Sequence, residues 1–124
     1  MNAAEHTRRL AALTDRIDAA AERIFEGAER LSSDVQDAET RVVDQSGDAP
    51  RVGPRTAWRW RRLEQLDDYV DATTESVVAW SKRVNEIHAE HPTGRWSRWR
   101  QRRRLLSIAK YFERAATRLE RTNP

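Results

Sequence analysis

Apolar residues in this chain recur at alternating spacings of three and four positions within three long stretches. This spacing is the period of an α-helix with one buried side, whereas a half-buried strand would alternate at every second position. The first stretch has this spacing at ten positions: Leu10, Thr14, Ile17, Ala21, Ile24, Ala28, Leu31, Val35, Ala38 and Val42. The second has it at Leu63, Leu66, Val70, Thr73, Val77, Trp80, Val84 and Ile87, and the third at Leu105, Ile108, Phe112, Ala115 and Leu119. The pattern predicts an all-α protein without strands.

Proline and glycine separate the three stretches. They predict helices over about 3–45, 56–91 and 95–121, with a loop over 46–55 that holds two Pro and two Gly. Thr56 is expected to cap the second helix, and Pro92 to end it.

The first helix is the longest of the three. At 1.5 Å per residue it would run about 65 Å, which is longer than either later helix. We therefore expect a break near 32–34, where Ser33 and Gln36 resemble a capping box. Each helix carries an apolar seam that must be covered by another helix, so the three should pack together. A short turn joins the last two helices and makes them antiparallel neighbours. The chain over 1–124 is therefore predicted to be a single domain. Its fold is expected to be an antiparallel bundle of three long helices; the sequence leaves open whether the first is continuous or divided in two at this break.

Charge is distributed unevenly along the chain. Residues 1–50 carry six arginines against eleven carboxylates, a net charge of −5. Residues 51–124 carry 17 Lys and Arg against nine carboxylates, a net charge of +8. Such an asymmetry favours a polyanion as the partner of the second half.

The basic residues of the last helix lie on one side of it. Projected at about 100° per residue, six cations fall opposite the apolar seam: Arg100, Arg103, Lys110, Arg114, Arg118 and Arg121. We call this set the α-helical cation stripe, or simply the stripe. Like charges in a row destabilise a helix, so their placement indicates an external anion. The stripe spans about 30 Å at the helical rise, which fits a nucleic-acid backbone.

Arginine also alternates with tryptophan where the second and third helices begin. The first such cluster comprises Arg51, Arg55, Trp58, Arg59, Arg61 and Arg62, and the second contains Trp96 and Trp99. Arg neutralises phosphates and exposed Trp stacks on bases, although Arg-rich faces also occur as plain solvated surfaces. Trp60 and Trp80 lie on or near the second seam and are expected in the core. Together the stripe and the two clusters form the predicted nucleic-acid site.

Other functional classes receive less support. The chain has no cysteine, which excludes disulfides and thiolate metal sites and suits a reducing cytoplasm. No apolar run approaches the ~20 residues of a membrane span, so we expect a cytoplasmic protein with no membrane partner. His88 and His91 lack a third metal ligand, and no phosphate loop or catalytic triad is recognisable. We therefore expect no enzyme activity, no cofactor and no metal.

The helical layout, the absence of cysteine and the arginine stretches 51–62 and 95–121 resemble the small subunit of multi-subunit CRISPR effector complexes. The resemblance lies in overall build and includes no motif. It implies copies of a helical bundle that line a guide–target nucleic acid without reading its sequence, and that associate head to tail with one another and with other subunits.

Two functions follow as hypotheses. The first is a non-enzymatic subunit that binds the phosphate backbone, within a ribonucleoprotein assembly. The second is a helical scaffold or coiled-coil module with no nucleic-acid role, favoured by the acidic first half and its long seam. The sequence leaves open RNA or DNA, and single or double strand.

Overall fold

Three long helices make up the part of the chain that the computed structural model describes, residues 2–46 and 53–124. They are α1 (Ala3–Ser46), α2 (Pro54–His88) and α3 (Arg95–Arg121), and no strand occurs within those two ranges. The prediction of an all-α protein with three long packed helices is therefore confirmed. None of these helices is apolar over a stretch long enough to cross a membrane.

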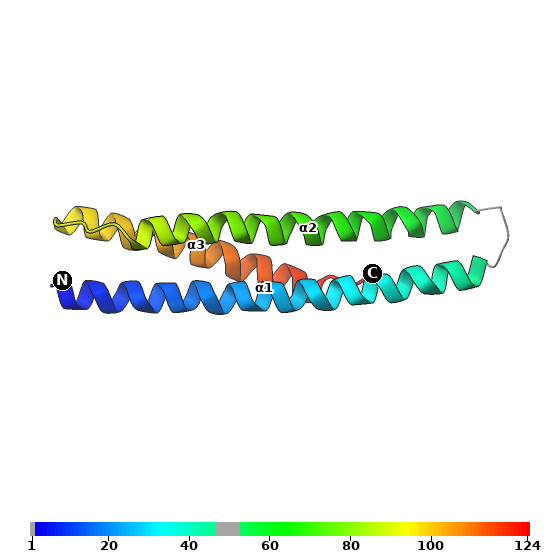
Figure 1. Cartoon of the computed structure of the whole chain (residues 1–124), viewed down its shortest axis with the longest axis horizontal. Helices are drawn as coiled ribbons and strands as arrows, with labels where there is room; N and C mark the ends of the chain where they lie inside the picture. Colours follow the sequence, from blue (N-terminus) through cyan, green and yellow to red (C-terminus); the bar gives the residue numbers. More distant parts are fainter. Residues whose placement is uncertain (1, 47–52) are drawn as a thin grey trace.

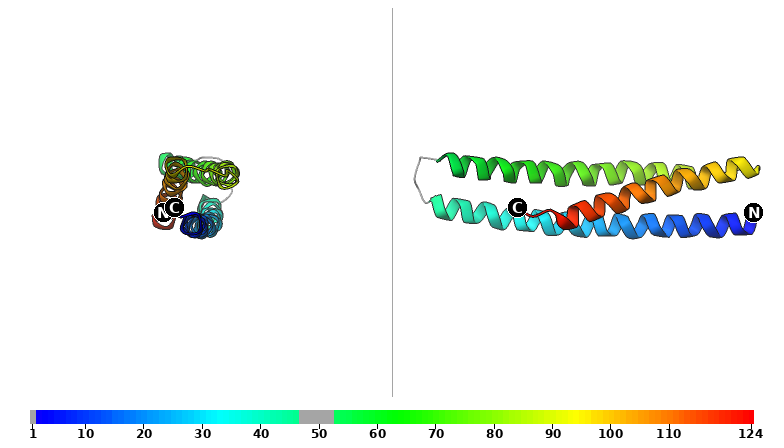
Figure 2. Two further views of the ribbon diagram at one scale, coloured as in Figure 1. Left: turned by 90° about the vertical axis from the view of Figure 1, so that its left-hand side faces the viewer. Right: turned by 180° about the vertical axis from the view of Figure 1, so that it is seen from behind.

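The helices differ in length, and this shapes the molecule. In Figure 1, α1 and α2 lie antiparallel and side by side along their whole length. Helix α3 starts next to the end of α2, crosses obliquely towards α1 and runs in the same direction as α1. With 27 residues against the 44 of α1, it ends partway along the pair, as Figure 2 also shows. One end of the molecule therefore has three helices and the other has two.

We call residues 35–46 and 54–69 the hairpin end, and residues 3–34 and 70–121 the three-helix end. The distinction is visible in Figure 1, where the C-terminus lies beside the last third of α1, short of the end of the α1–α2 pair. Helix α3 packs closely on α1 at Gly27, where a Cβ built on the glycine would lie 3.4 Å from the Cβ of Leu119, in ordinary van der Waals contact.

The core consists of the three predicted apolar seams. Most of the predicted positions are buried, and Ala20, Ala109 and Ala116 join them. Trp60 and Trp80 are corrections, since they are 39% and 41% exposed. Trp80 lies beside α3, where its ring is 6.1 Å from that of Tyr111, and its smaller seam neighbours Val77 and Val84 are buried.

The expected break in α1 is absent, since the helix continues through 32–34. Leu31 and Val35 flank Ser33 and are both fully buried, so packing holds the helix straight on either side of it. Tertiary contacts here outweigh the local capping preference.

The boundaries of α2 also differ from the prediction of 56–91. The helix begins at Pro54 after Gly53, without a side-chain cap from Thr56, because the fixed φ of Pro suits the first helical position. It ends at His88, several residues before Pro92. Helix α3 covers 95–121 as predicted. Of the expected loop 46–55, residues 47–52 lie outside the described part.

Candidate nucleic-acid interface

The six cations of the stripe lie on the outer side of α3. All are exposed, opposite the fully buried Leu105, Phe112 and Leu119. Within residues 2–46 and 53–124, none of the six forms an ion pair with a carboxylate. The stripe therefore presents its full charge to solvent.

The two carboxylates of α3 that border the stripe are bound to α1 instead. Arg16 donates two hydrogen bonds to Glu113, of 2.9 and 2.6 Å, and Arg23 donates to Glu120. Both pairs are separated by 97 residues, a constant offset that shows α1 and α3 packing in parallel register. Arg30, a further seven residues along, donates to the carbonyl of Leu119 at 2.9 Å.

Sequence analysis missed this row of arginines on α1. Its signal is the seven-residue spacing of Arg9, Arg16, Arg23 and Arg30 within a half of net negative charge. Seven residues are nearly two helical turns, so all four lie on one side of α1. That side proves to be the one beside α3.

These pairs also determine the protonation of Glu113. The hydrogen bonds from Arg16 hold the pKa of the Glu113 carboxyl below its ordinary value, against a smaller opposing effect of burial. The same contact raises the pKa of Arg16. Glu113 is thus held mainly by Arg16 of α1, with a weaker electrostatic interaction with Lys110 of the stripe.

The other arginines of α3 bind groups of the protein itself. Arg98 donates to the carbonyl of Pro92 at 3.4 Å, and Arg104 pairs with Glu90 at 3.2 Å. Arg102 donates to Nδ1 of His6 at 2.8 Å. These three are partly buried and hold α3 against its neighbours, whereas the stripe residues do not.

Two of the predicted tryptophans lie at the start of the stripe. The rings of Trp96 and Trp99 are stacked, with centroids 4.9 Å apart and planes 25° apart. The guanidinium carbon of Arg103 lies 5.8 Å from the centre of the Trp99 ring, a cation–π distance. Trp96 is 64% exposed and Trp99 43%, so both offer ring surface to a ligand.

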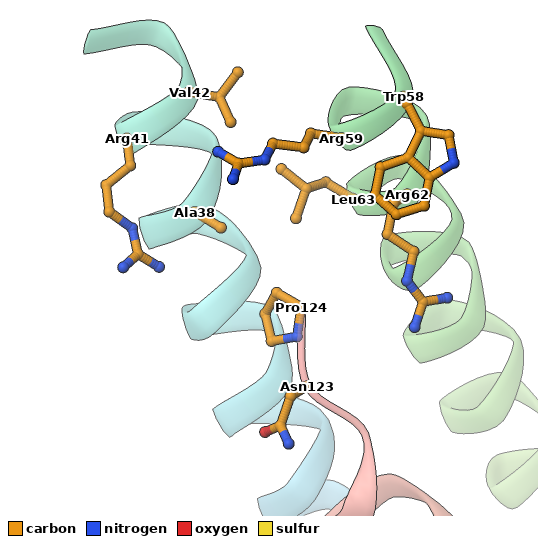
Figure 3. A pocket seen from close by; sticks show the side chains of 9 residues that line it. All are labelled: Ala38, Arg41, Val42, Trp58, Arg59, Arg62, Leu63, Asn123 and Pro124. Carbon is orange, nitrogen blue, oxygen red and sulfur yellow. The ribbon is translucent and has the colours of Figure 1, made fainter. Parts of the chain in front are cut away.

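The predicted cluster at the start of α2 is only partly brought together. Figure 3 shows Arg59, Arg62 and Trp58 around a groove of about 530 Å³ at the hairpin end, above Leu63. Arg41 of α1, which sequence analysis missed, also lines this groove, as does Pro124. Arg55 and Arg61 are exposed but do not line it, and Arg51 lies outside the described residues.

The groove at the hairpin end lies beyond the C-terminal end of α3, where Asn123 and Pro124 line it. A second, open groove of about 570 Å³ runs along the last turns of α3 and includes Lys110, Arg114, Arg118 and Arg121. After Thr122, the chain reaches the hairpin groove through Asn123 and Pro124. Basic side chains of α3, α1 and α2 therefore follow one another along the molecule.

Within the described residues, no group of three or more His, Asp or Glu side chains is placed to hold a metal ion.

Comparisons with models of protein families, with curated proteins and with solved structures gave no match to this chain. The residue geometry is therefore the basis for a functional proposal.

Proposed function

We propose that this protein is a non-enzymatic module that binds the phosphate backbone of a nucleic acid through α3. The observation that carries the proposal is that the stripe remains exposed and unpaired while the neighbouring carboxylates Glu113 and Glu120 are held by α1. A helix surface that served only solubility would have no reason to separate its charges in this way.

The dimensions support a strand lying along the helix. From Arg100 to Arg121 the stripe extends about 30 Å at the helical rise, and one strand carries a phosphate about every 3.4 Å. The hairpin groove would extend the path beyond Pro124. A guanidinium group can bind a phosphate through two parallel hydrogen bonds. Such contacts position a strand but do not read its sequence.

Fluorescence anisotropy with labelled oligonucleotides at several salt concentrations tests the proposal. We expect log Kd to rise linearly with log salt, because bound cations release counterions from the phosphates. Replacing Arg114 and Arg118 by Gln should reduce the slope by about 1.4 if both contact a single strand, and should weaken binding to all sequences alike.

Lys82 and Arg83 provide a matched control. Both are exposed cations on α2, and neither lines the groove at the end of α3. The Lys82→Gln, Arg83→Gln double variant removes the same charge and should leave the slope near that of the unaltered protein. A flat salt response, or equal effects of the two double variants, would contradict the proposal.

We further propose that the module works within a ribonucleoprotein assembly, as the resemblance to CRISPR small subunits implies. The support is the all-helical three-helix build; membership in such a complex is tested by identifying what copurifies from the native host. Guide RNA and effector subunits are expected, and their absence would remove this part of the proposal.

One observation favours the alternative of a protein-binding scaffold. Trp60, Glu64, Asp67, Asp71 and Val78 follow one another on one side of α2 at spacings of three, four and seven residues. This side borders Glu39 of α1, whose pKa is raised by burial and by the nearby Asp67 and Glu64. Exposed apolar and acidic side chains together suit contact with a protein.

Light scattering distinguishes the two functions. A discrete oligomer that does not change when RNA or DNA is added favours the scaffold. Purification with high absorbance at 260 nm, or a mass that increases with added oligonucleotide, favours nucleic-acid binding.

A further inference from the structure

A shallow groove between α1 and α3 joins Trp99 and Arg103 of the predicted site to residues of α1 and has the composition of a nucleotide pocket. Its volume is about 400 Å³, and it is lined by Arg9, Ala12, Leu13, Arg16, Trp99, Arg102, Arg103 and Leu106. We call it the Trp99 pocket. Pockets for small ligands begin at about 300 Å³ and combine apolar walls with a few polar groups, and this groove meets both conditions.

The four arginines of the Trp99 pocket are not equivalent. Arg16 is held by Glu113 and Arg102 donates to His6. Arg9 and Arg103 have no carboxylate partner in residues 2–46 and 53–124. Two guanidinium groups from different helices are thus available at the same groove, and guanidinium groups bind phosphates strongly.

The remaining lining is apolar and aromatic. Leu13 and Leu106 are half-buried, and the ring of Trp99 is backed by its stack with Trp96. Stacking of a base on an aromatic ring is tolerant of sequence. Within a duplex the base faces are covered by their neighbours, so only an unpaired base can enter such a pocket.

We propose that the Trp99 pocket binds one unpaired nucleotide, with its base against Trp99 and its phosphate at Arg9 and Arg103, so that the protein prefers single strands. This inference rests on the proposed function, because the rest of the strand follows the stripe. It adds a contact between Trp99 and one base, which the phosphate contacts of the stripe do not provide.

The test compares three labelled ligands of equal length: oligothymidylate, an abasic strand with the same phosphates, and a duplex. We expect the abasic strand and a duplex to bind about tenfold more weakly than oligothymidylate, within the range measured for a lost base–aromatic stack. If all three bind equally, the Trp99 pocket is overturned while the proposed function stands. If none binds in a salt-dependent manner, the proposed function fails, and the pocket fails with it.

Variants of adjacent arginines sharpen the test. Arg9 lines the pocket, whereas Arg8 is equally charged and exposed but points to another side of α1. Arg9→Ala should weaken the binding of oligothymidylate severalfold, because the phosphate loses one of its two guanidinium partners, and Arg8→Ala should not. Trp99→Ala should abolish the preference. Because Arg9 and Arg8 are both on the surface, the pair remains informative even if Trp99→Ala fails to fold, and equal effects of Arg8→Ala and Arg9→Ala would overturn the inference.

Discussion

The two ends of the molecule are built from the same apolar repeat and differ in how completely it is covered. At the three-helix end, α3 covers the α1–α2 pair, and Ile24, Leu105 and Phe112 have no exposed surface. At the hairpin end the same repeat continues through Val42 and Leu63, but the third side is an open groove edged with arginine. A third helix thus converts a two-helix seam into a core, and where it ends a basic groove remains.

Buried polar side chains also distinguish the two ends, since those of the described residues lie at the three-helix end. At the three-helix end His6 and Gln101 are both buried and joined by a 2.8 Å hydrogen bond. Arg102 can only donate, so Nδ1 of His6 accepts from it and Nε2–H donates to Gln101 Oε1. The amide nitrogen of Gln101 then donates to the carbonyls of Ile87 and Glu90. This network ties all three helices together where α3 begins.

The largest predicted difference between the ends concerns core truncation. Phe112→Ala should lower the free energy of unfolding by about 3–5 kcal/mol, because it leaves a cavity enclosed by three helices. Leu63→Ala should cost about 2 kcal/mol, the low end for such a change, because water of the adjoining groove can fill the space. Urea denaturation measures both, and equal losses would show that the hairpin end is packed as tightly as the other.

The next effect concerns the buried polar network. Gln101→Leu keeps much of the side-chain volume but removes the partner of His6 Nε2–H, the side-chain donor to the Glu90 carbonyl and one of the two donors to the Ile87 carbonyl, at a cost of about 1–3 kcal/mol. Gln36→Leu is the matched control, since Gln36 is exposed at the hairpin end. We expect a lower urea midpoint for Gln101→Leu and little change for the control. A neutral Gln101→Leu would show that the network does not hold α3 in place.

The smallest effect depends on pH and has opposite sign at the two ends. The pKa of Glu113 is lowered by Arg16, so its contribution to stability is present above its ordinary value of 4.5 and is lost as pH falls through the lower, folded-state pKa. The pKa of Glu39 is raised by burial and by Asp67, so its ionisation costs stability once pH rises through the folded-state pKa, and costs nothing below 4.5.

Thermal unfolding at neutral and at acidic pH checks this sign. Glu113→Gln should lower the melting temperature slightly at neutral pH, and Glu39→Gln should raise it slightly. The difference for Glu39→Gln should shrink as the pH falls through the raised folded-state pKa towards 4.5, and that for Glu113→Gln only as the pH falls below 4.5 through the lowered folded-state pKa. The same sign for both variants at neutral pH would remove the electrostatic part of the contrast between the ends.

Much of the fold was predictable, because each helix carries its own period. Most seam positions from Leu10 to Leu119 follow from spacing, and the bounds of α3 follow from spacing together with Pro92 and Gly94 before it. The break expected at 32–34 was wrong, because local capping signals say nothing of the burial of Leu31 and Val35. Trp60 and Trp80 were misplaced because periodicity gives the side of a helix but not the space available there.

Of the candidate site, the stripe was predictable from the sequence, whereas the Trp99 pocket and the groove at the hairpin end were not. The stripe lies on a single helix, so its common side could be read from the spacing of Arg100 to Arg121. The Trp99 pocket combines Arg9 with Leu106, and the hairpin groove combines Arg41 with Arg59. Such sets depend on which helices lie together and at what offset, which no periodicity within a single helix contains.

The sequence by itself determined three amphipathic helices and the side of α3 that carries unopposed cations, because both are properties of local helical geometry. The tertiary structure decided that α3 lies in parallel register with α1, and therefore that Arg16 and Arg23 bind Glu113 and Glu120. It also decided where α3 ends along the α1–α2 pair. Pairing across helices depends on contacts between residues about 97 positions apart, and it is this pairing that leaves the stripe exposed to a ligand.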